Sequence, residues 1–248
     1  MDNSRAPGNV DCAIVLAGGL GTRLREAVPD LPKPMAPING RPFLEHQLDY
    51  WIDQGIKRFV LSVGYRRDAI TSHFGASYRD ATIEYAIEAS PLGTGGGLLL
   101  AAAFVDRKRP CLVVNGDTFF EVSLVELESF HHRKGSDWTI AMFRTAESGR
   151  YMGLQVAHDG RIESMRSGLP GEAEVLSNGG VYLIGADILA DCGFAVGTPA
   201  SLENDILAAL RDRGAKIFGY ECAGRFIDIG IPHDYFRAGE LLDGRNQP

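Results

Sequence analysis

The sequence predicts an α/β fold in which a mixed, mostly parallel sheet is flanked by helices. In the first 136 residues, short apolar runs rich in β-branched residues alternate with stretches whose apolar residues repeat at helical spacing. After about residue 137, strands follow one another directly. The 248 residues are 45% hydrophobic, which is enough for a large buried core.

Strand, loop and helix units repeat through the first half. The opening strand, residues 11–17, is apolar and is followed by glycines. This pattern is typical of a buried strand that leads into a loop. The first helix, residues 42–54, has its apolar residues at helical spacing, with Pro42 at its start and Gly55 after its end. Further strands are predicted at 58–63, 82–87 and 111–114, and further helices at 68–74, 95–105 and 124–132.

The second half predicts a mixed lobe that continues the first. Its strands are expected at 138–143, 154–157, 180–184, 216–221 and 225–229, and its helix at 202–211. No stretch rich in proline, serine or charge separates the two halves. We therefore expect a flexible N-terminus over residues 1–10 and a single domain over 11–240, with halves at about 11–136 and about 137–240.

The net charge and the hydropathy of the chain argue against a nucleic acid and a membrane as partners. With a formal net charge of -7, the chain has no broad positive surface for a nucleic acid. The longest apolar run, residues 98–105, is far shorter than the ~18 residues of a membrane span, and the polar N-terminal residues predict no signal peptide. We expect a cytoplasmic protein without a membrane partner. A homo-oligomer is compatible with the sequence, which does not determine the oligomeric state.

The glycine-rich segment "IVLAGGLGTRLREAVPDLPKPM", residues 14–35, does not fit two common nucleotide-binding patterns. A Walker phosphate loop requires Gly-Lys-Ser/Thr, which is missing after Gly18. A dinucleotide fingerprint would begin with Gly19 and Gly21, but Leu24 stands in place of its third glycine. A plain glycine-rich turn remains an alternative.

Two cations favour a phosphate-binding loop over a plain turn. Arg23 lies in the glycine-rich segment, and Lys33 lies between Pro32 and Pro34, which stiffen the chain around it. Backbone N–H groups and two cations of different geometry suit a ligand that carries several negative charges. The segment therefore predicts a non-Walker site for a nucleoside triphosphate.

Five segments resemble the sugar-1-phosphate nucleotidyltransferases, also called nucleotide-sugar pyrophosphorylases. They are "LAGGLGTRL" with "LPKPM", "SPLGTGG", "VVNGD", "SNGGVYLI" and "FIDIGIPHDY", in the order and spacing of that family, within residues 11–236. The resemblance implies a Rossmann-like nucleotide-diphospho-sugar transferase fold, whose N-terminal half binds the nucleotide and whose C-terminal half binds the sugar. The implied reaction transfers a nucleoside monophosphate to a sugar 1-phosphate and releases pyrophosphate.

Two aspartates are the expected metal ligands. Asp117 follows an apolar strand and a glycine, so we expect it at the carboxyl end of a sheet strand, where ligands bind in open α/β folds. Asp228 has apolar neighbours, among which an unpaired carboxylate would be costly. By resemblance the pair holds Mg²⁺, which binds one or two carboxylates together with substrate phosphates. The alternatives are a turn-forming Asp117 and an internal salt bridge of Asp228.

The sequence contains no pattern of a protein nucleophile, and the implied reaction needs none. The phosphate of the sugar 1-phosphate is itself an anionic nucleophile, so the protein has to position the reactants and neutralise charge. The resemblance implies four catalytic residues: Arg23 on the β- and γ-phosphates, Lys33 at the α-phosphorus, and the metal ligands Asp117 and Asp228. It also implies the nucleotide-binding residues Leu16, Ala17, Gly18, Gly19, Gly21, Thr22, Arg23, Glu88, Pro91, Gly93 and Thr94.

Glu88 favours guanine as the base. It stands just before "SPLG", where members of the family read the base, commonly with a glutamine that suits thymine or uracil. A carboxylate can accept from both donors of the guanine edge, N1–H and N2–H, whereas thymine offers a single donor between two acceptors. GTP is therefore the expected substrate. The alternative is that Glu88 only caps the end of a strand in solvent.

Family positions along the sugar predict the second substrate site. The corresponding residues are Gly116, Gly153, Arg166, Asn178, Glu203 and Asp205. Carboxylates accept from sugar hydroxyls, although Glu203 and Asp205 also fit the first turn of a helix that Ser201 begins. Many relatives have a Glu-Lys pair that is missing here. Arg166 is the expected substitute for its lysine, although a guanidinium does not copy the geometry of an ammonium.

The compact length, "LGTGGGLLLAA" and "SLENDIL" most resemble the bacterial D-glycero-α-D-manno-heptose 1-phosphate guanylyltransferases. The expected product is GDP-heptose, a precursor of surface polysaccharide or glycan, and mannose 1-phosphate is the alternative sugar. Two other classes are a catalytically silent nucleotide-sugar binding module, suggested by the missing Glu-Lys pair, and an NAD dehydrogenase. A dehydrogenase would need an acidic residue about 20 positions after the loop, and residues 37–41 contain none.

Overall fold

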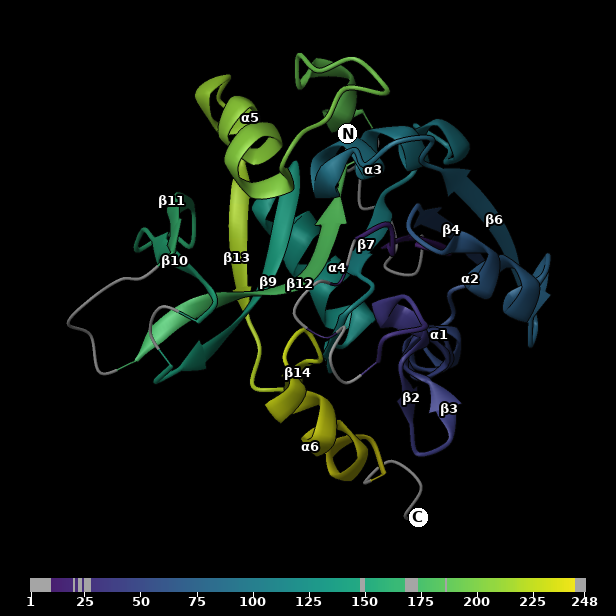
Figure 1. Cartoon of the computed structure of the whole chain (residues 1–248). Helices are drawn as coiled ribbons and strands as arrows, with labels where there is room; N and C mark the ends of the chain where they lie inside the picture. Colours follow the sequence, from purple (N-terminus) through teal and green to yellow (C-terminus); the bar gives the residue numbers. More distant parts are fainter. Residues whose placement is uncertain are drawn as a thin grey trace.

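Figure 1 shows the computed structural model of the chain, which describes residues 10–19, 21, 24, 28–147, 150–167, 174–185 and 187–243, without the side chains of Ser167 and Asp191. Ten of the described strands form one mixed sheet. Its centre is parallel and consists of β7 (Cys111–Asn115), β1 (Cys12–Leu16), β4 (Arg58–Val63) and β6 (Ala81–Ile87), in that order. The short β5 (Ser77–Tyr78) adds an antiparallel edge beside β6. The expected α/β fold with a mixed sheet is confirmed.

The second half of the chain extends the sheet from β7. There β12 (Val175–Ile184) runs antiparallel to β7 and also pairs with β9 (Trp138–Thr145) and β10 (Met152–Val156). β13 (Ile217–Glu221) lies parallel to β9, and β11 (Ile162–Ser167) forms the edge beside β10. β12 therefore joins the parallel centre to the strands of the second half (Figure 1).

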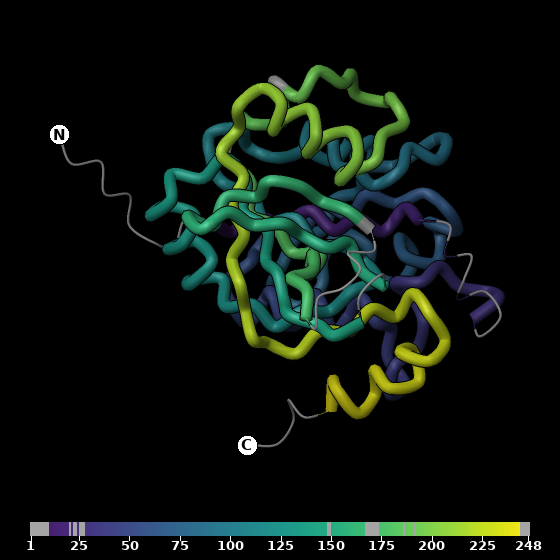
Figure 2. Tube along the Cα trace, turned by 90° about the vertical axis from the view of Figure 1, so that its left-hand side faces the viewer, coloured from purple at the N-terminus to yellow at the C-terminus, as the bar shows by residue number. Residues whose placement is uncertain are grey.

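Helices cover both faces of the sheet, as Figures 1 and 2 show. Those on one face are α1 (Phe43–Asp53), α2 (Arg67–Phe74) and α4 (Leu124–Lys134), and those on the other are α3 (Gly93–Ala101) and α5 (Ala208–Asp212). Side chains alternate along β1, so Ala13 and Val15 join the first core while Cys12 and Ile14 join the second. In the described part of the chain, the helices are too short or too polar to cross a membrane.

Short elements build the end of the molecule that carries α6 (Pro232–Asp243). β8 (Thr118–Phe120) pairs with β14 (Phe226–Asp228) in a small separate sheet. β2 (Pro37–Ile38) and β3 (Arg41–Pro42) form a second one. The remaining short helices are the 3₁₀ helices η2 (Lys33–Met35), η3 (Ala102–Phe104) and η4 (Ile188–Asp191) and the π-helix η5 (Leu202–Leu207).

The structure differs from the sequence prediction mainly around glycines and short elements. The strand predicted at 180–184 begins at Val175, because the chain crosses a register shift between Asn178 and Val181 and then continues the same strand. Gly180 adopts a positive φ of 70° in this bulge. β8, β11 and the helix α6 were not predicted from the sequence. The helix predicted at 202–211 divides into η5 and α5.

Acid is expected to destabilise the fold through His131, a buried residue of α4. Its Nδ1 lies 2.9 Å from Oγ1 of Thr139, and burial lowers its pKa to about 4. In the unfolded chain the pKa stays near 6.5, so the stability that depends on neutral His131 is complete above that pH. It is lost as the pH falls from about 6.5 toward 4, by about 3 kcal/mol in all.

Urea unfolding at pH 7 and at pH 5 measures this loss. His131→Gln should reduce the difference in unfolding free energy between the two pH values. His158, in the exposed turn between β10 and β11, supplies the matched control, and His158→Gln should leave the difference as it is. A pH dependence that survives unchanged in His131→Gln would contradict the assignment.

Candidate active site

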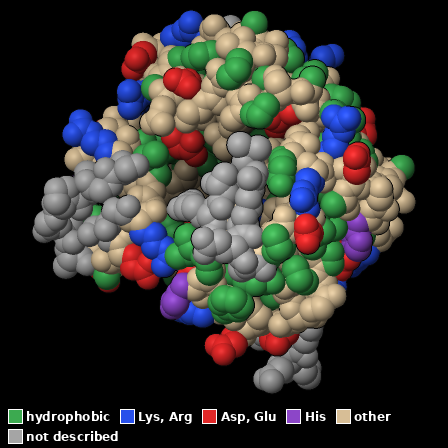
Figure 3. All heavy atoms as spheres, viewed as in Figure 1, with side chains coloured by type: hydrophobic (Ala, Val, Ile, Leu, Met, Phe, Trp, Pro, Cys, Tyr) green, Lys and Arg blue, Asp and Glu red, His purple; other side chains and the backbone are tan. Residues whose placement is uncertain are grey.

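A cavity of about 610 Å³ lies at the carboxyl ends of the parallel strands. Its walls include Ala17 after β1, Glu88 after β6 and Asp117 after β7. The face of the molecule in Figure 3 is hollowed near its centre. Loops at the carboxyl ends of strands are where open α/β sheets bind ligands, as the sequence predicted for Asp117.

The glycine-rich segment forms one wall of this cavity. Its lining residues are Leu16, Ala17, Gly18, Gly19 and Gly21. Gly21 has a φ of 60°, which favours glycine, and a Cβ there would lie 2.9 Å from Cγ of Lys33. Thr22 and Arg23 lie outside the described residues, so their contacts with a triphosphate stay predictions.

Glu88 is a buried carboxylate at the nucleotide end of the cavity. Glu88 is 7% exposed. Its carboxylate accepts hydrogen bonds from Ser62 Oγ at 3.1 Å and from the Leu92 N–H at 3.0 Å. The alternative of a strand cap in solvent is therefore wrong. Pro91, Gly93 and Thr94 line the cavity nearby, as the sequence predicted. Each carboxylate oxygen keeps acceptor capacity beyond its one internal hydrogen bond.

Gly18 provides the space that Glu88 fills. A Cβ at Gly18 would lie 2.0 Å from Glu88 Oε1, whereas a Cβ at Gly19 would have no atom within 4 Å. Neither glycine has a positive φ. We therefore expect Gly18→Ala to destabilise the ligand-free protein by about 1–3 kcal/mol through overpacking, and Gly19→Ala to be neutral or slightly stabilising.

Thermal unfolding without ligand measures both variants. The expected result is a midpoint several degrees lower for Gly18→Ala alone. Equal midpoints for the two variants would show that Glu88 does not occupy the space beside Gly18.

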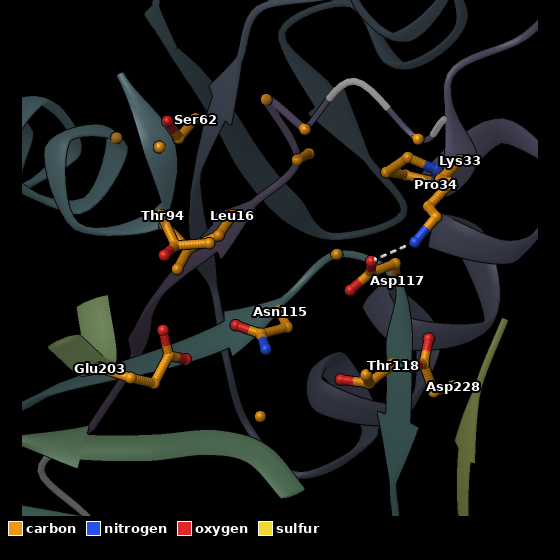
Figure 4. Close-up of a pocket in the computed structure, with 18 of the residues that line it drawn as sticks. Leu16, Lys33, Pro34, Ser62, Thr94, Asn115, Asp117, Thr118, Glu203 and Asp228 are labelled. Atoms are coloured by element: carbon orange, nitrogen blue, oxygen red, sulfur yellow. Dashed lines mark hydrogen bonds and ion pairs between the residues drawn. The ribbon is translucent and has the colours of Figure 1, made fainter. Parts of the chain in front are cut away.

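Lys33, Asp117 and Asp228 meet at the other end of the glycine-rich wall. Lys33, at the start of η2, has an 11% exposed side chain, and its Nζ lies 2.9 Å from Asp117 Oδ2 (Figure 4). The pairing of β8 with β14 brings Asp228 beside Thr118, the residue that follows Asp117. A Cβ at Gly230 would lie 2.7 Å from Lys33 Nζ and 2.6 Å from Asp228 Oδ1, so these two atoms border the same small space. Asp228 also accepts from the Gly230 N–H at 2.6 Å.

The two aspartates have the donor chemistry of a magnesium site. Both are carboxylates that line the cavity, and the side chain of Asp117 is 36% exposed, so a ligand can reach it. The described residues hold no cluster of three or more His, Cys, Asp or Glu side chains suited to a metal. Two carboxylates without further protein ligands suit Mg²⁺, which keeps waters and binds substrate phosphates at its other positions.

Asn178 and Glu203 form the opposite wall with the buried Tyr182. Asn178 Nδ2 donates to the Tyr182 hydroxyl at 2.8 Å, and its Oδ1 accepts from the Gly180 N–H at 3.0 Å. The Tyr182 hydroxyl lies 3.5 Å from Glu203 Oε1. Burial raises the pKa of Glu203 and raises that of Tyr182 well above its usual range. Gly116 also lines the cavity, so three of the six sugar-site residues expected from the sequence meet there.

A family model described as nucleotidyl transferase matches residues 12–243. The chain belongs to this family. It is 38% identical to the D-glycero-alpha-D-manno-heptose 1-phosphate guanylyltransferase of Aneurinibacillus thermoaerophilus, over 93% of this chain and 97% of that protein. The mannose-1-phosphate guanylyltransferase of Mycobacterium tuberculosis is 32% identical, over 94% of this chain and 65% of that protein. The crystal structure of HddC from Yersinia pseudotuberculosis complexed with GMP-PN has a TM-score of 0.79 and 33% identity, over 92% of this chain and 98% of that chain.

Three expected sugar-site residues of this nucleotidyl transferase lie outside the cavity lining. Gly153 is buried in β10, where it pairs with Arg166 of β11, and Arg166 is exposed at this edge of the sheet. Asp205 is exposed, and its Oδ2 accepts from the Ser201 N–H at 2.7 Å, so it caps its own helix. The structure thus places Gly153 between two neighbouring strands, Arg166 at the edge of the sheet and Asp205 at the start of a helix, rather than against the cavity.

Several lining residues were not predicted from the sequence. Asn115 and Thr118 flank Asp117, and their Oδ1 and Oγ1 atoms are buried without a hydrogen-bond partner among the described residues. Such atoms suit a bound ligand. Ser62, Arg150 and Tyr151 also line the cavity. "VVNGD" contained a signal for Asn115, but no local pattern identifies the others, because tertiary packing brings them to the site.

Proposed function

We propose that this nucleotidyl transferase transfers GMP from GTP to D-glycero-α-D-manno-heptose 1-phosphate and releases pyrophosphate. The observation that carries the proposal is the buried Glu88 carboxylate, which shares one cavity with the Lys33, Asp117 and Asp228 cluster. A carboxylate suits the two adjacent donors of guanine. The heptose is favoured by the high similarity to a heptose 1-phosphate guanylyltransferase along almost the whole chain.

In the proposed reaction, an oxygen of the sugar phosphate attacks the α-phosphorus of GTP. The new bond links the two phosphorus atoms through that oxygen, and the bond to the β-phosphate breaks, so pyrophosphate leaves with the electron pair. Lys33 would stabilise charge at the α-phosphorus, and Arg23 is expected to hold the β- and γ-phosphates. The Glu203 carboxylate would accept from sugar hydroxyls, the Asn178 amide would also bind them, and the glycine-rich wall would hold the nucleotide.

Asp117 and Asp228 would hold Mg²⁺, which when bound supplies neutralisation of phosphate charge. Lys33 at 2.9 Å from Asp117 keeps this carboxylate oriented. We propose that residues 11–240 act as one domain, in which the half up to about 136 binds the nucleotide and the half from about 137 binds the sugar. We expect the reaction to take place in the cytoplasm, where GTP is supplied, and its product to feed polysaccharide or glycan synthesis.

Pyrophosphate release from a matrix of four nucleoside triphosphates and several sugar 1-phosphates tests the proposal. The expected result is release with GTP alone, fastest with the heptose 1-phosphate. Faster release with mannose 1-phosphate would contradict the sugar assignment and favour a mannose 1-phosphate guanylyltransferase. No release with any pair, together with binding of GDP-sugars, would favour a catalytically silent module.

A further inference from the structure

The cavity contains more acidic than basic side chains. Its described lining includes four carboxylates and two cations, Lys33 and Arg150, and Lys33 is ion-paired with Asp117. The proposed reaction brings the phosphate of the sugar 1-phosphate into this space, where nearby carboxylates repel it. Arg166, which the sequence suggested for this phosphate, lies outside the lining. Arg150 is therefore the described cation of the cavity whose role is still to be assigned.

Arg150 lies on the border of two cavities. It lines the main cavity and a neighbouring one of about 740 Å³, and Tyr151 and Phe226 do the same. Its guanidinium carbon is 4.9 Å from the centre of the Tyr151 ring, which packs edge-on against Phe226. Phe226 belongs to β14, the strand that ends at Asp228. The Tyr151 ring therefore links the guanidinium to the strand that carries Asp228.

A buried carboxylate holds Arg150 in place. Its Nη2 is ion-paired with Asp234 Oδ2, in the first turn of α6, and Asp234 is 3% exposed. Asp234 also lies 3.7 Å from Nη1 of Arg237, so two arginines share its charge. Removing Arg150 from this pair would leave a buried charge poorly compensated, which keeps the arginine beside Asp234.

The second ion pair of Arg150, with the carboxylate of Glu147, is weak enough for a phosphate to replace it. Nη1 of Arg150 lies 2.5 Å from Oε2 of Glu147, whose side chain is 53% exposed. Exposed ion pairs contribute little, so a phosphate can replace Glu147 at low cost. A guanidinium has five N–H donors in a fixed plane, which allows it to keep Asp234 and to bind phosphate oxygens with its remaining donors.

We infer that Arg150, positioned by Asp234, binds the phosphate of the sugar 1-phosphate and takes the place of the lysine of the missing Glu-Lys pair. This inference rests on the proposed function. It also gives a role to Asp234 of "FIDIGIPHDY": α6 anchors a substrate-binding arginine from outside the cavity.

Steady-state kinetics of Arg150 variants tests the inference. Arg150→Ala should raise the KM for the sugar 1-phosphate about 10- to 100-fold, as expected for the loss of charged hydrogen bonds, and should change the KM for GTP less than about twofold. The KM for the sugar 1-phosphate in Arg150→Lys should lie between the values of the wild type and of Arg150→Ala, because an ammonium keeps the charge but lacks the planar set of donors of a guanidinium. Arg144→Ala is the matched control, since Arg144 lines only the neighbouring cavity and pairs with Glu221. An equal rise in both KM values, or none, would overturn the inference.

A double variant separates binding from folding. Arg150→Met with Asp234→Leu removes both buried charges at once, so it should fold even where a single variant does not. It should show the same rise in the sugar 1-phosphate KM as Arg150→Ala. Asp234→Asn should raise the KM for the sugar 1-phosphate less than Arg150→Ala does. In Asp234→Glu this KM should lie between the values of the wild type and of Asp234→Asn, which a merely structural role would not produce.

Calorimetric titration with the sugar 1-phosphate distinguishes this inference from the proposed function. If the wild-type protein binds the sugar phosphate but releases no pyrophosphate, the proposed function fails. If the wild-type protein is active and Arg150→Ala binds the sugar phosphate with unchanged affinity, the inference about Arg150 fails and the proposed function stands.

Discussion

Asp117→Asn is expected to reduce the rate of pyrophosphate release by at least about 100-fold, because it removes charge from the site that would hold the metal and its phosphates. Asp228→Asn should have an effect of similar size, since both carboxylates line the cavity, Asp117 pairs with Lys33 Nζ, and Asp228 borders the same small space as that nitrogen. Titration with Mg²⁺ should show that each variant needs a higher metal concentration for half-maximal rate. The amide keeps the shape of the side chain, and its oxygen can still accept from Lys33 Nζ, so the protein should still fold.

Asp80→Asn is the matched control for these variants. Asp80 is exposed, pairs with Lys57 and lies outside the cavity lining. It should keep the wild-type rate and the wild-type metal dependence. A wild-type rate in Asp117→Asn would exclude this carboxylate from the metal site, and a rate without added Mg²⁺ would exclude the metal itself.

Glu88→Gln is expected to change which nucleotide the enzyme prefers. The amide has one acceptor oxygen and one donor nitrogen where the carboxylate has two acceptor oxygens, so it fits guanine less well and thymine or uracil better. We expect kcat/KM with GTP to fall about 10- to 100-fold, as for one lost charged hydrogen bond, and the ratio of UTP or dTTP to GTP to rise. Competition assays with pairs of nucleotides give this ratio directly.

Glu84→Gln tests whether the effect depends on position. Glu84 lies on the same strand, β6, and pairs with Arg58 rather than lining the cavity. It should leave nucleotide preference unchanged. If Glu88→Gln also kept the wild-type preference, Glu88 would have only the structural role of binding Ser62 and the Leu92 N–H.

Apolar strands of the parallel centre could be predicted from the sequence, because their buried residues form continuous runs. β4 has the predicted bounds, β1 is one residue shorter than predicted at each end, and β7 is one residue longer at its carboxyl end. β12 was predicted five residues short, since Gly179 and Gly180 interrupt its pattern where the register shifts. β14 was predicted at 225–229 and spans Phe226–Asp228. Its partner β8 was not predicted, since a strand of three residues is defined by its partner rather than by its own periodicity.

The candidate site could be predicted where one segment holds the functional residue. The segments around Gly18, Glu88, Asp117 and Asp228 all reach the cavity. Arg166 does not, because the pairing of β10 with β11 keeps it at the edge of the sheet. Arg150 reaches the cavity through its contact with Asp234, 84 positions later in the chain, and a local sequence pattern does not contain such information.

Transfer of a label from the α-phosphorus of GTP tests the central claim most directly. With GTP labelled at that position, Mg²⁺ and D-glycero-α-D-manno-heptose 1-phosphate, we predict that the label appears in GDP-heptose and that one pyrophosphate is released for each molecule formed. Label that stays in GTP, or that appears in GMP or GDP without a sugar, would contradict guanylyl transfer to the sugar phosphate.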